Sequence, residues 1–316
     1  MSEFDLIRRH FTWPAARRDV TLGVGDDAAL LQVPAGHELA VSVDTLVAGV
    51  HFPQETPAGA LGHKALAVNL SDLAAMGADP AWATLALTLP EADDTWVAEF
   101  SAGFQALARE YPVDLVGGDT TRGPLSVTVQ VMGLVPQGKA LRRSGARAGD
   151  GIYVTGTLGD GALGLRLLAQ QSEIDPAGQR LVERLMRPRP RIQAGIALRH
   201  SAHAAIDISD GLLADLGHVL DASGVGARIH LAQLPLSDEF LAVSGEVIDW
   251  SLPLSGGDDY ELVFTMPPDM EFLIGTQPGG VRWTRIGTVE RSAGLHVEDM
   301  DGQPMSLSRF GYQHFA

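Results

Sequence analysis

Aspartates beside glycines and apolar runs are the residues of this 316-residue chain whose type and spacing could do chemistry. Asp119 is the clearest case, because it directly follows an apolar run and two glycines. Acids stand in comparable surroundings at Asp27, Asp44, Asp72, Asp207 and Asp210. Taken singly, each acid is more typical of a helix cap or a turn than of a metal ligand. Taken together they indicate a bound cation, because unpaired carboxylates near a core are costly. Ligands that are all oxygen atoms favour the hard cations Mg²⁺ or Mn²⁺. We predict that they converge on one metal–phosphate site.

Three further residues could contact a ligand. Arg143 lies in a Gly- and Arg-rich stretch and is a candidate phosphate-binding cation, although the same pattern fits a solvated arginine in a linker. His51 follows Asp44 closely in the sequence. It could contact the same ligand, or it could have a structural role. Tyr312 could cover a ligand ring, or dock the end of the chain.

Other chemistries are excluded or disfavoured by the sequence. The chain has no cysteine, which excludes disulfides, zinc–thiolate sites and cysteine nucleophiles. It also lacks the lysine-containing P-loop pattern. Two glycine-rich stretches, residues 23–28 and 159–164, imitate a dinucleotide fingerprint, but both carry acids that would repel a pyrophosphate.

The elements that must position these residues follow from periodicity. Helices are expected at 4–11, 60–76, 94–111, 161–169, 178–187, 191–200 and 211–222. Strands are expected at 27–33, 39–43, 81–89, 113–116, 125–135, 152–155, 227–231, 261–266 and 285–290. The strand 113–116 should end at the two glycines, where the backbone can turn, and several strands have hairpin-like spacing. We predict an α+β fold with a domain boundary in residues 136–150.

Composition sets the broad class. Hydrophobic residues make up 45% of the chain and charged residues 20%, which is typical of a folded, soluble protein. The net charge of −16 makes nucleic acid a poor partner, because binding its backbone needs basic surface. No apolar run is long enough for a membrane span, and the N-terminus has no signal-peptide pattern. We expect a cytoplasmic protein that does not associate with membranes.

Six motifs in order resemble the thiamine-monophosphate kinase family, which belongs to the superfamily of aminoimidazole ribonucleotide synthetase and selenophosphate synthetase. They begin at Gly25, Ser42, Asn69, Gly117, Asp207 and Ser255, and the resemblance covers nearly the whole chain. It implies an N-terminal metal- and ATP-binding domain (1–137) that forms a homodimer through its sheet. It also implies a C-terminal mixed-sheet domain (148–316) that completes the ATP and thiamine-phosphate site in a cleft between the two.

The resemblance also implies roles for single residues. Metal ligands would be Asp27, Ser42, Asp44, Asp72, Asp119, Asp207 and Asp210, and of these Asp44, Asp119 and Asp210 are expected to be catalytic. ATP contacts would be Gly118, Asp119, Arg143 and Ser209. Thiamine-phosphate contacts would be His51, Asp258 and Tyr312. Two positions depart from the common motifs: residue 43 is Val where some members have Thr, and residue 258 is Asp where Glu is common.

The implied reaction is direct in-line transfer from ATP to thiamine monophosphate, assisted by several Mg²⁺ ions. The acceptor phosphate is mostly ionised at neutral pH, so the reaction needs charge neutralisation more than a base. The alternatives are another ATP-dependent member of the superfamily, such as aminoimidazole ribonucleotide synthetase, and a non-catalytic protein that binds metal or phosphate.

Overall fold

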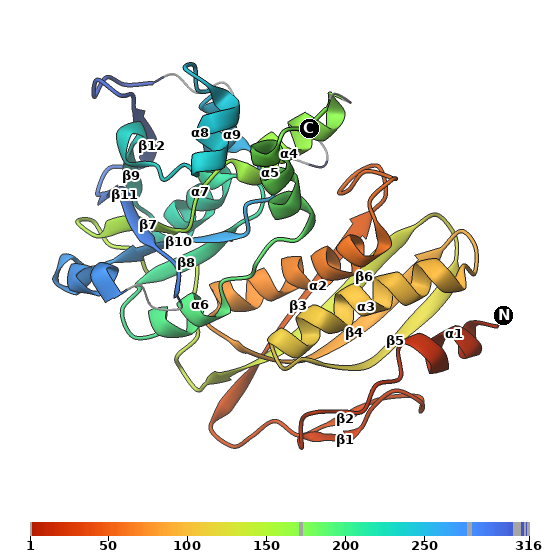
Figure 1. The fold of residues 1–316 in the computed structure, drawn as a ribbon. Helices are drawn as coiled ribbons and strands as arrows, with labels where there is room; N and C mark the ends of the chain where they lie inside the picture. Colours follow the sequence, from red (N-terminus) through yellow and green to blue (C-terminus); the bar gives the residue numbers. More distant parts are fainter. Residues whose placement is uncertain (1, 171–172, 277–279, 306–310, 313, 315–316) are drawn as a thin grey trace. The chain divides into compact units, whose positions relative to one another are not determined.

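The computed structural model describes residues 2–170, 173–276, 280–305, 311–312 and 314. The chain divides into two compact units: unit 1 comprises residues 1–73 and 78–138, and unit 2 comprises residues 74–77 and 139–316. Each unit combines helices with a sheet of mixed strand directions, which confirms the predicted α+β class (Figure 1). No helix among the described residues is both long and apolar enough to cross a membrane.

Unit 1 is built on a four-stranded sheet with the order β3-β6-β4-β5. Its elements are α1 (Glu3–His10), β1 (Val20–Leu22), β2 (Leu30–Leu31), β3 (His37–Val47), α2 (Ala58–Ala75), β4 (Asp79–Leu89), α3 (Asp94–Glu110), β5 (Asp114–Arg122) and β6 (Ser126–Pro136). β4 and β5 pair in parallel across the connecting helix α3, whereas β6 pairs antiparallel with both β3 and β4. The helices α2 and α3 cover one face of the sheet (Figure 1).

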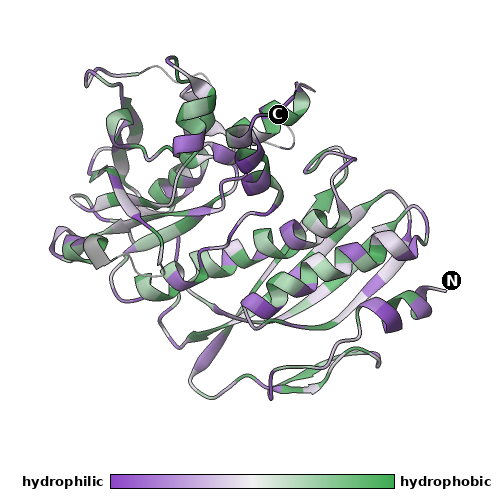
Figure 2. Cartoon of the chain, in the orientation of Figure 1, coloured by the Kyte–Doolittle hydropathy of each residue, from purple (hydrophilic) through white to green (hydrophobic). Residues whose placement is uncertain are grey.

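Glycines let α2 and α3 pack at very short range. A Cβ atom on Gly62 would lie 2.0 Å from the carbonyl oxygen of Phe100, and one on Gly103 would lie 1.9 Å from that of Gly59. Nearly all of α2 is buried, as its apolar colouring in Figure 2 suggests, because α3 and the sheet together leave little of its surface to water. The two helices therefore form a rigid layer behind the strands that carry several predicted site residues.

The opposite face of the sheet is partly open. Along β3 the side chains of Leu39, Val41 and Val43 are 43%, 52% and 56% exposed, whereas the alternate residues turn towards the helices. Near the other end of the sheet, β1 and β2 cover a small core that includes Trp82 and Val116. Unit 1 thus presents an apolar, uncovered stripe on its edge strand β3.

Unit 2 is built on a six-stranded sheet with the order β12-β9-β11-β7-β10-β8. Its elements are β7 (Gly151–Thr155), α4 (Asp160–Ala169), α5 (Pro176–Met186), α6 (Ile192–Leu198), β8 (Ala204–Ile208), α7 (Leu212–Ser223), β9 (Gly226–His230), η1 (Leu231–Gln233), α8 (Asp238–Ser244), α9 (Ser251–Ser255), β10 (Glu261–Met266), η2 (Pro268–Thr276), β11 (Trp283–Glu290) and β12 (Gly294–Glu298). Aliphatic residues on one face of this sheet form the main core with α7. On the other face Tyr153 stacks on Phe264, whose ring meets Trp283 edge-on.

Three predictions about strands in unit 1 are wrong. β5 does not end at the two glycines but runs through them to Arg122. Gly118 allows the backbones of β5 and β4 to lie close together, because a Cβ there would lie 1.9 Å from the carbonyl oxygen of Leu85. The strand expected at 27–33 is only two residues long. Strands that follow one another in sequence are not hairpins, apart from the small pair β1–β2, since β6 inserts between β3 and β4.

Candidate active site

The helix-facing side of β3 brings three of the predicted metal ligands together in unit 1. Ser42 and Asp44 point towards α2, where the Ser42 hydroxyl donates to a carboxylate oxygen of Asp72 at 2.5 Å. The Asn69 side-chain oxygen accepts the backbone N–H of Asp44 at 2.9 Å, which fixes the strand against the helix. The set consists only of oxygen donors and is half-buried, a composition that fits Mg²⁺.

Asp119 lies elsewhere in the same unit. In cross-strand register, Asp44 pairs with Val129, Val129 with Leu85, and Leu85 with Gly118. Three strand spacings, about 14 Å, therefore separate β3 from β5 along this row. Asp119 is one residue further along and belongs to the opposite face, where its side chain is exposed. Within one chain the structure does not bring Asp119 to Asp44.

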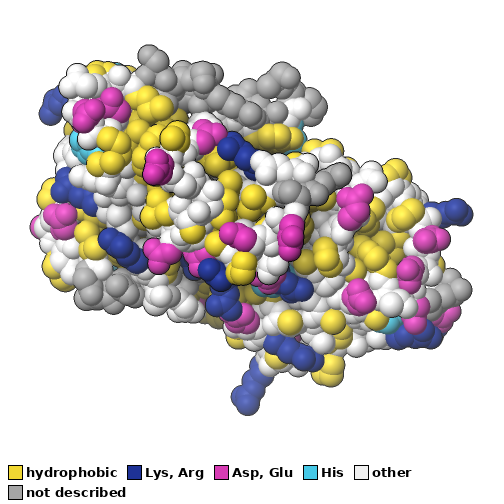
Figure 3. Space-filling view, turned by 45° about the horizontal axis from the view of Figure 1, so that its top comes forward, with side chains coloured by type: hydrophobic (Ala, Val, Ile, Leu, Met, Phe, Trp, Pro, Cys, Tyr) yellow, Lys and Arg dark blue, Asp and Glu magenta, His cyan; other side chains and the backbone are white. Residues whose placement is uncertain are grey.

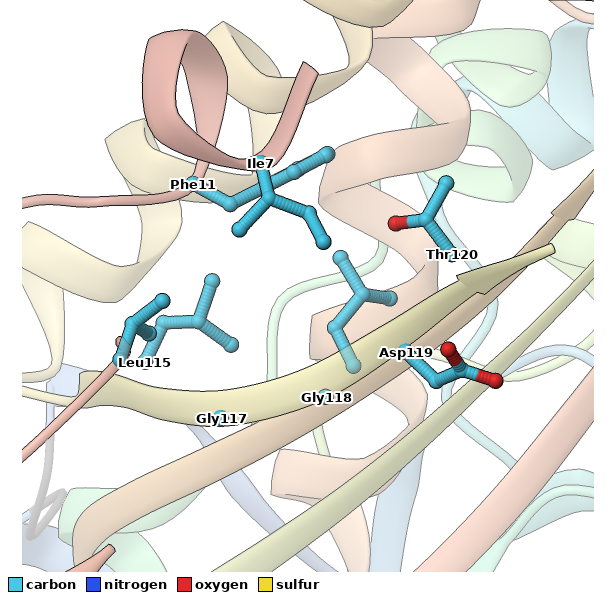
Figure 4. Close-up of a pocket in the computed structure, with 9 residues that line it drawn as sticks. Ile7, Phe11, Leu115, Gly117, Gly118, Asp119 and Thr120 are labelled. Atoms are coloured by element: carbon cyan, nitrogen blue, oxygen red, sulfur yellow. The ribbon is translucent and has the colours of Figure 1, made fainter. Parts of the chain in front are cut away.

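A small pocket adjoins Gly118 and Asp119 in unit 1 (Figure 4). Its walls are mostly apolar, and they come from α1, β4, β5 and the loop before β2. The lining residues are Ile7, Phe11, Val24, Leu85, Leu115, Gly117, Gly118, Asp119 and Thr120. In Figure 4 the carboxylate of Asp119 points away from the side of the strand on which Ile7 and Thr120 lie. The pocket is therefore an apolar hollow with a carboxylate at its margin.

Asp27 and His51 occupy loops of unit 1. Asp27 is exposed, and its N–H donates to the carboxylate of Asp26 at 2.8 Å. His51 Nδ1 accepts the N–H of Val47 at 3.0 Å, which holds the ring against the turn after β3. This contact supports a structural role for His51 and sets the orientation in which its ring could meet a ligand.

Three segments of unit 2 meet at the C-terminal end of β8. The carbonyl oxygen of Ser209 accepts the N–H of Asp258 at 2.9 Å, and that of Asp210 accepts the N–H of Tyr312 at 3.1 Å. Glycines permit this contact: a Cβ on Gly257 would lie 2.4 Å from the oxygen of Ser209. The structure thus gathers a predicted ATP contact, a predicted metal ligand and two predicted substrate contacts in one place.

The acids of this cluster differ in their surroundings. Asp207 is buried within β8, whereas Asp210 is half-buried in the loop that follows. Burial raises the pKa of Asp210; the charges of His314 and His218 oppose the shift, and that of Asp258 adds to it. A cation at this loop would be favoured, because it would stabilise the ionised form.

Asp215 is a residue of this site that the sequence interpretation missed. One of its carboxylate oxygens accepts the backbone N–H groups of Ser209, Asp210 and Gly211 at 3.0, 3.1 and 3.1 Å. Burial raises its pKa to about 7, the charge of Asp210 adds to the shift, and the N–H groups oppose it. Its place in the first turn of α7 was the available signal, because acids there commonly hold exposed N–H groups.

Asp259 belongs to the motif that begins at Ser255, but its contact with the start of α4 was not predicted. Its carboxylate oxygens both accept the N–H of Gly159 at 2.9 Å, at the start of α4. Burial raises its pKa well above the ordinary value, a shift that this N–H opposes. The helix start in the stretch 159–164 is therefore filled by a carboxylate of the chain itself. A dinucleotide would need that position for its pyrophosphate.

Arg143 is exposed, but its loop is tied down within unit 2. The Ser223 hydroxyl accepts the N–H groups of Gly145 and Ala146, both at 3.1 Å, and donates to the carbonyl oxygen of Arg143 at 3.3 Å. The carbonyl oxygen of Arg142 accepts the N–H of Ala205 at 2.9 Å. The guanidinium of Arg143 thus extends from an ordered loop rather than from a loose linker.

Among the described residues, no group of three or more His, Asp or Glu side chains lies close enough together to hold one metal ion. Unit 1 carries Asp27, Ser42, Asp44, Asp72 and Asp119, and unit 2 carries Asp207 and Asp210. The convergence of all these ligands on one site stays a prediction.

Comparison with known proteins identifies the class. Residues 25–135 match the N-terminal domain and residues 147–299 the C-terminal domain of AIR synthase related proteins. Over 324 residues the chain is 51% identical to thiamine-monophosphate kinase of Escherichia coli (strain K12), covering 99% of this chain and 98% of that protein. The chain therefore belongs to the thiamine-monophosphate kinase family.

Two solved structures agree with this assignment. Thiamine-monophosphate kinase from Stenotrophomonas maltophilia K279a superposes with a TM-score of 0.85 and 49% identity, over 92% of this chain and 93% of that chain. A structure described as AaThiL complexed with AMPPCP and TMP superposes with a TM-score of 0.81 and 33% identity, over 99% and 96% of the two chains. Nearly the whole chain thus shares its fold with proteins of this family.

Proposed function

We propose that the chain is an ATP-dependent kinase that phosphorylates thiamine monophosphate, yielding thiamine diphosphate and ADP. One observation carries the proposal beyond family membership. Ser209, Asp210, Asp258 and Tyr312, which the family motifs assign to ATP, metal and substrate, are joined by direct backbone contacts in unit 2. A related structure that contains AMPPCP and TMP is consistent with these two ligands.

The residues present suit a direct transfer with Mg²⁺. Bound Mg²⁺ would neutralise the phosphates of the donor and acceptor and hold them in line. Ser42, Asp44 and Asp72 supply oxygen donors on the helix-facing side of β3. Arg143 can bind a phosphate from its ordered loop. The acceptor is a phosphate oxygen that is already mostly ionised, so no protein group has to remove its proton.

The hollow beside Gly118 has a volume of about 40 Å³ and mostly apolar walls, which include Phe11, Ile7 and Leu115. A hollow of this size is too small for a nucleotide base, so we do not assign it to ATP. On the face drawn in Figure 3, Lys and Arg side chains stand scattered among acids, and its described residues form no continuous basic surface for nucleic acid.

We further propose that the active form is a homodimer made through the open face of the unit 1 sheet. Leu39, Val41 and Val43 form an apolar stripe on this face, which a second copy of the chain can cover. The dimer would also cover the face on which Asp119 lies. If Asp44 and Asp119 bind one ion, the two carboxylates have to come from different copies, since about 14 Å within one chain is too far for a shared ion.

The test is ATP turnover by the purified full chain with Mg²⁺, measured with and without thiamine monophosphate. The proposal expects ADP release to depend on thiamine monophosphate. Unphosphorylated thiamine serves as the control, because it lacks the phosphate group that accepts the transfer. ADP release that is equal with and without thiamine monophosphate would reject the proposal, as would binding of ATP without any turnover.

A further inference from the structure

Two residues of the motif after α9 have an unusual backbone. Asp258 and Tyr260 have φ values of 67° and 51°, and they are the non-glycine residues with positive φ in the described part of the chain. Such conformations persist only where the surrounding structure enforces them, and they cluster at functional sites. The turn at Asp258 and Tyr260 therefore has a backbone conformation that is typical of a functional site.

Contacts on both sides enforce the turn. On one side Asp258 and Tyr260 donate their N–H groups to the carbonyl oxygens of Ser209 and Ile208, at 2.9 and 2.8 Å. On the other side the carboxylate of Asp259 binds the N–H of Gly159 at the start of α4. The segment is therefore clamped between the end of β8 and the start of α4, and its side chains have fixed directions.

The consequence of the turn is a contact between the two strained residues. The Tyr260 hydroxyl donates to Oδ1 of Asp258 at 3.1 Å. Tyr260 is only 8% exposed, so its ring is held by packing, whereas Asp258 is half-buried and reaches the cluster that contains Asp210 and Tyr312. A packed ring with one hydroxyl on one carboxylate oxygen restricts the rotamer of that carboxylate.

We infer that Tyr260 is a positioning residue that orients the carboxylate of Asp258 towards the cationic end of thiamine monophosphate, an inference that rests on the proposed function. Asp258 stands where the family motif commonly has the longer Glu. A shorter acid has less reach, so its direction matters more for contact with the substrate. Tyr260 acts through Asp258 and does not touch the substrate itself.

The test is Tyr260→Phe in the full chain, with both Michaelis constants, kcat and the melting temperature measured. Tyr153→Phe is the matched control, because the Tyr153 hydroxyl is also buried and has no hydrogen-bond partner among the described residues. We expect Tyr260→Phe to raise KM for thiamine monophosphate about five- to tenfold, since a hydrogen bond to a charged group is lost. KM for ATP, kcat and the melting temperature should stay close to those of the control.

A double-mutant cycle shows whether Tyr260 works through Asp258. Asp258→Gly removes the carboxylate and accepts the positive φ. In that background Tyr260→Phe should change KM for thiamine monophosphate less than twofold. An undiminished effect in that background overturns the inference, as does a Tyr260→Phe enzyme that matches the control. If the unmodified chain shows no turnover that depends on thiamine monophosphate, the proposed function fails and this inference fails with it.

Discussion

At the scale of single residues, the predicted metal ligands differ in how the chain holds them. Ser42, Asp44 and Asp72 are held between β3 and α2, whereas Asp119 is exposed on the other face of the sheet. Asp44→Asn and Asp119→Asn should each lower kcat by about 100-fold or more, because each removes one charge needed to neutralise the phosphates. Steady-state assays at saturating Mg²⁺ measure this, with Glu91→Gln, an exposed acid outside the site, as control.

Unfolding curves complete that comparison. Neither substitution changes side-chain volume, so the free energy of unfolding should stay within about 1 kcal/mol of the unmodified chain. Near-normal turnover in both variants would remove these two residues from the reaction. A large loss of stability would attribute the lost activity to misfolding instead.

Asp215 gives a prediction about pH. Its folded-state pKa is raised to about 7 from an unfolded value of 3.8, so the folded state binds more protons between these two values. Stability therefore falls as pH rises from about 4 to about 7, by up to about 4 kcal/mol. Asp215→Asn cannot ionise and should not show this part of the fall.

The measurement for Asp215 is urea unfolding at pH 5 and pH 8 in EDTA, which removes bound cations. The gap in free energy of unfolding between Asp215→Asn and the unmodified chain should shift in favour of the variant at pH 8. A gap that is the same at both pH values would mean that Asp215 titrates normally in the folded state.

Tyr312 tests the substrate end of the site. Its ring is 39% exposed and meets His314 edge-on, with centroids 5.0 Å apart. A thiazolium cation over a tyrosine face gains about 0.5–2 kcal/mol, so Tyr312→Ala should raise KM for thiamine monophosphate several-fold and leave KM for ATP nearly unchanged. Phe272→Ala, at an aromatic residue that is 69% exposed, is the control. A lowered melting temperature with unchanged Michaelis constants would show that Tyr312 only anchors the chain.

At the scale of elements, replacing a helical glycine with alanine should lower or raise the stability of the chain, depending on the space around that glycine. A Cβ on Gly103 in α3 would lie 1.9 Å from the backbone of Gly59, whereas one on Gly217 in α7 would have no neighbour within 4 Å. Gly103→Ala should therefore cost about 2–3 kcal/mol through forced separation of α2 and α3. Gly217→Ala should stabilise the chain by about 0.5–1 kcal/mol, because alanine favours the helix. Chemical denaturation measures both, and equal effects would contradict the close packing.

Elements also show how far sequence alone could go. The long helices α3 and α7 were predictable, because their apolar residues recur at helical spacing. α2 is buried on nearly all sides, and its run of helix-forming residues before Gly77 predicted it instead. The extent of β5 was not, because a glycine needed for close approach and a glycine needed for a turn look alike in a sequence. The pairing of β6 with β3 and β4 depends on contacts across long stretches of chain.

The candidate site was predictable only in part, because the motifs mark some of its residues and not others. Family motifs pointed to Ser209, Asp210, Asp258 and Tyr312, and the structure brings these together. Asp259 accepts the N–H of Gly159 from a distant segment, a contact that exists only once the fold is formed. Asp215 accepts N–H groups from residues four to six positions earlier, so its place in the first turn of α7 was a signal that the sequence did offer.

At the scale of the whole molecule, the homodimer proposal makes a prediction about mixtures. If Asp44 and Asp119 of different copies form one site, inactive Asp44→Asn and Asp119→Asn chains can complement each other. A mixed dimer then holds one site with both carboxylates intact, so mixing under conditions of subunit exchange should restore up to about a quarter of the unmodified activity. Assays after mixing measure this. Val43→Asp in both chains is the control, because a charge on the apolar stripe should block dimerisation.

The measurement that tests the central claim most directly is the fate of a labelled γ-phosphate. The full chain is incubated with γ-³²P-labelled ATP, Mg²⁺ and thiamine monophosphate, and the small molecules and the protein are separated. Direct transfer predicts that the label appears in thiamine diphosphate, in an amount equal to the ADP formed, with none bound to the protein. Label in inorganic phosphate alone, or held covalently on the chain, would contradict the account.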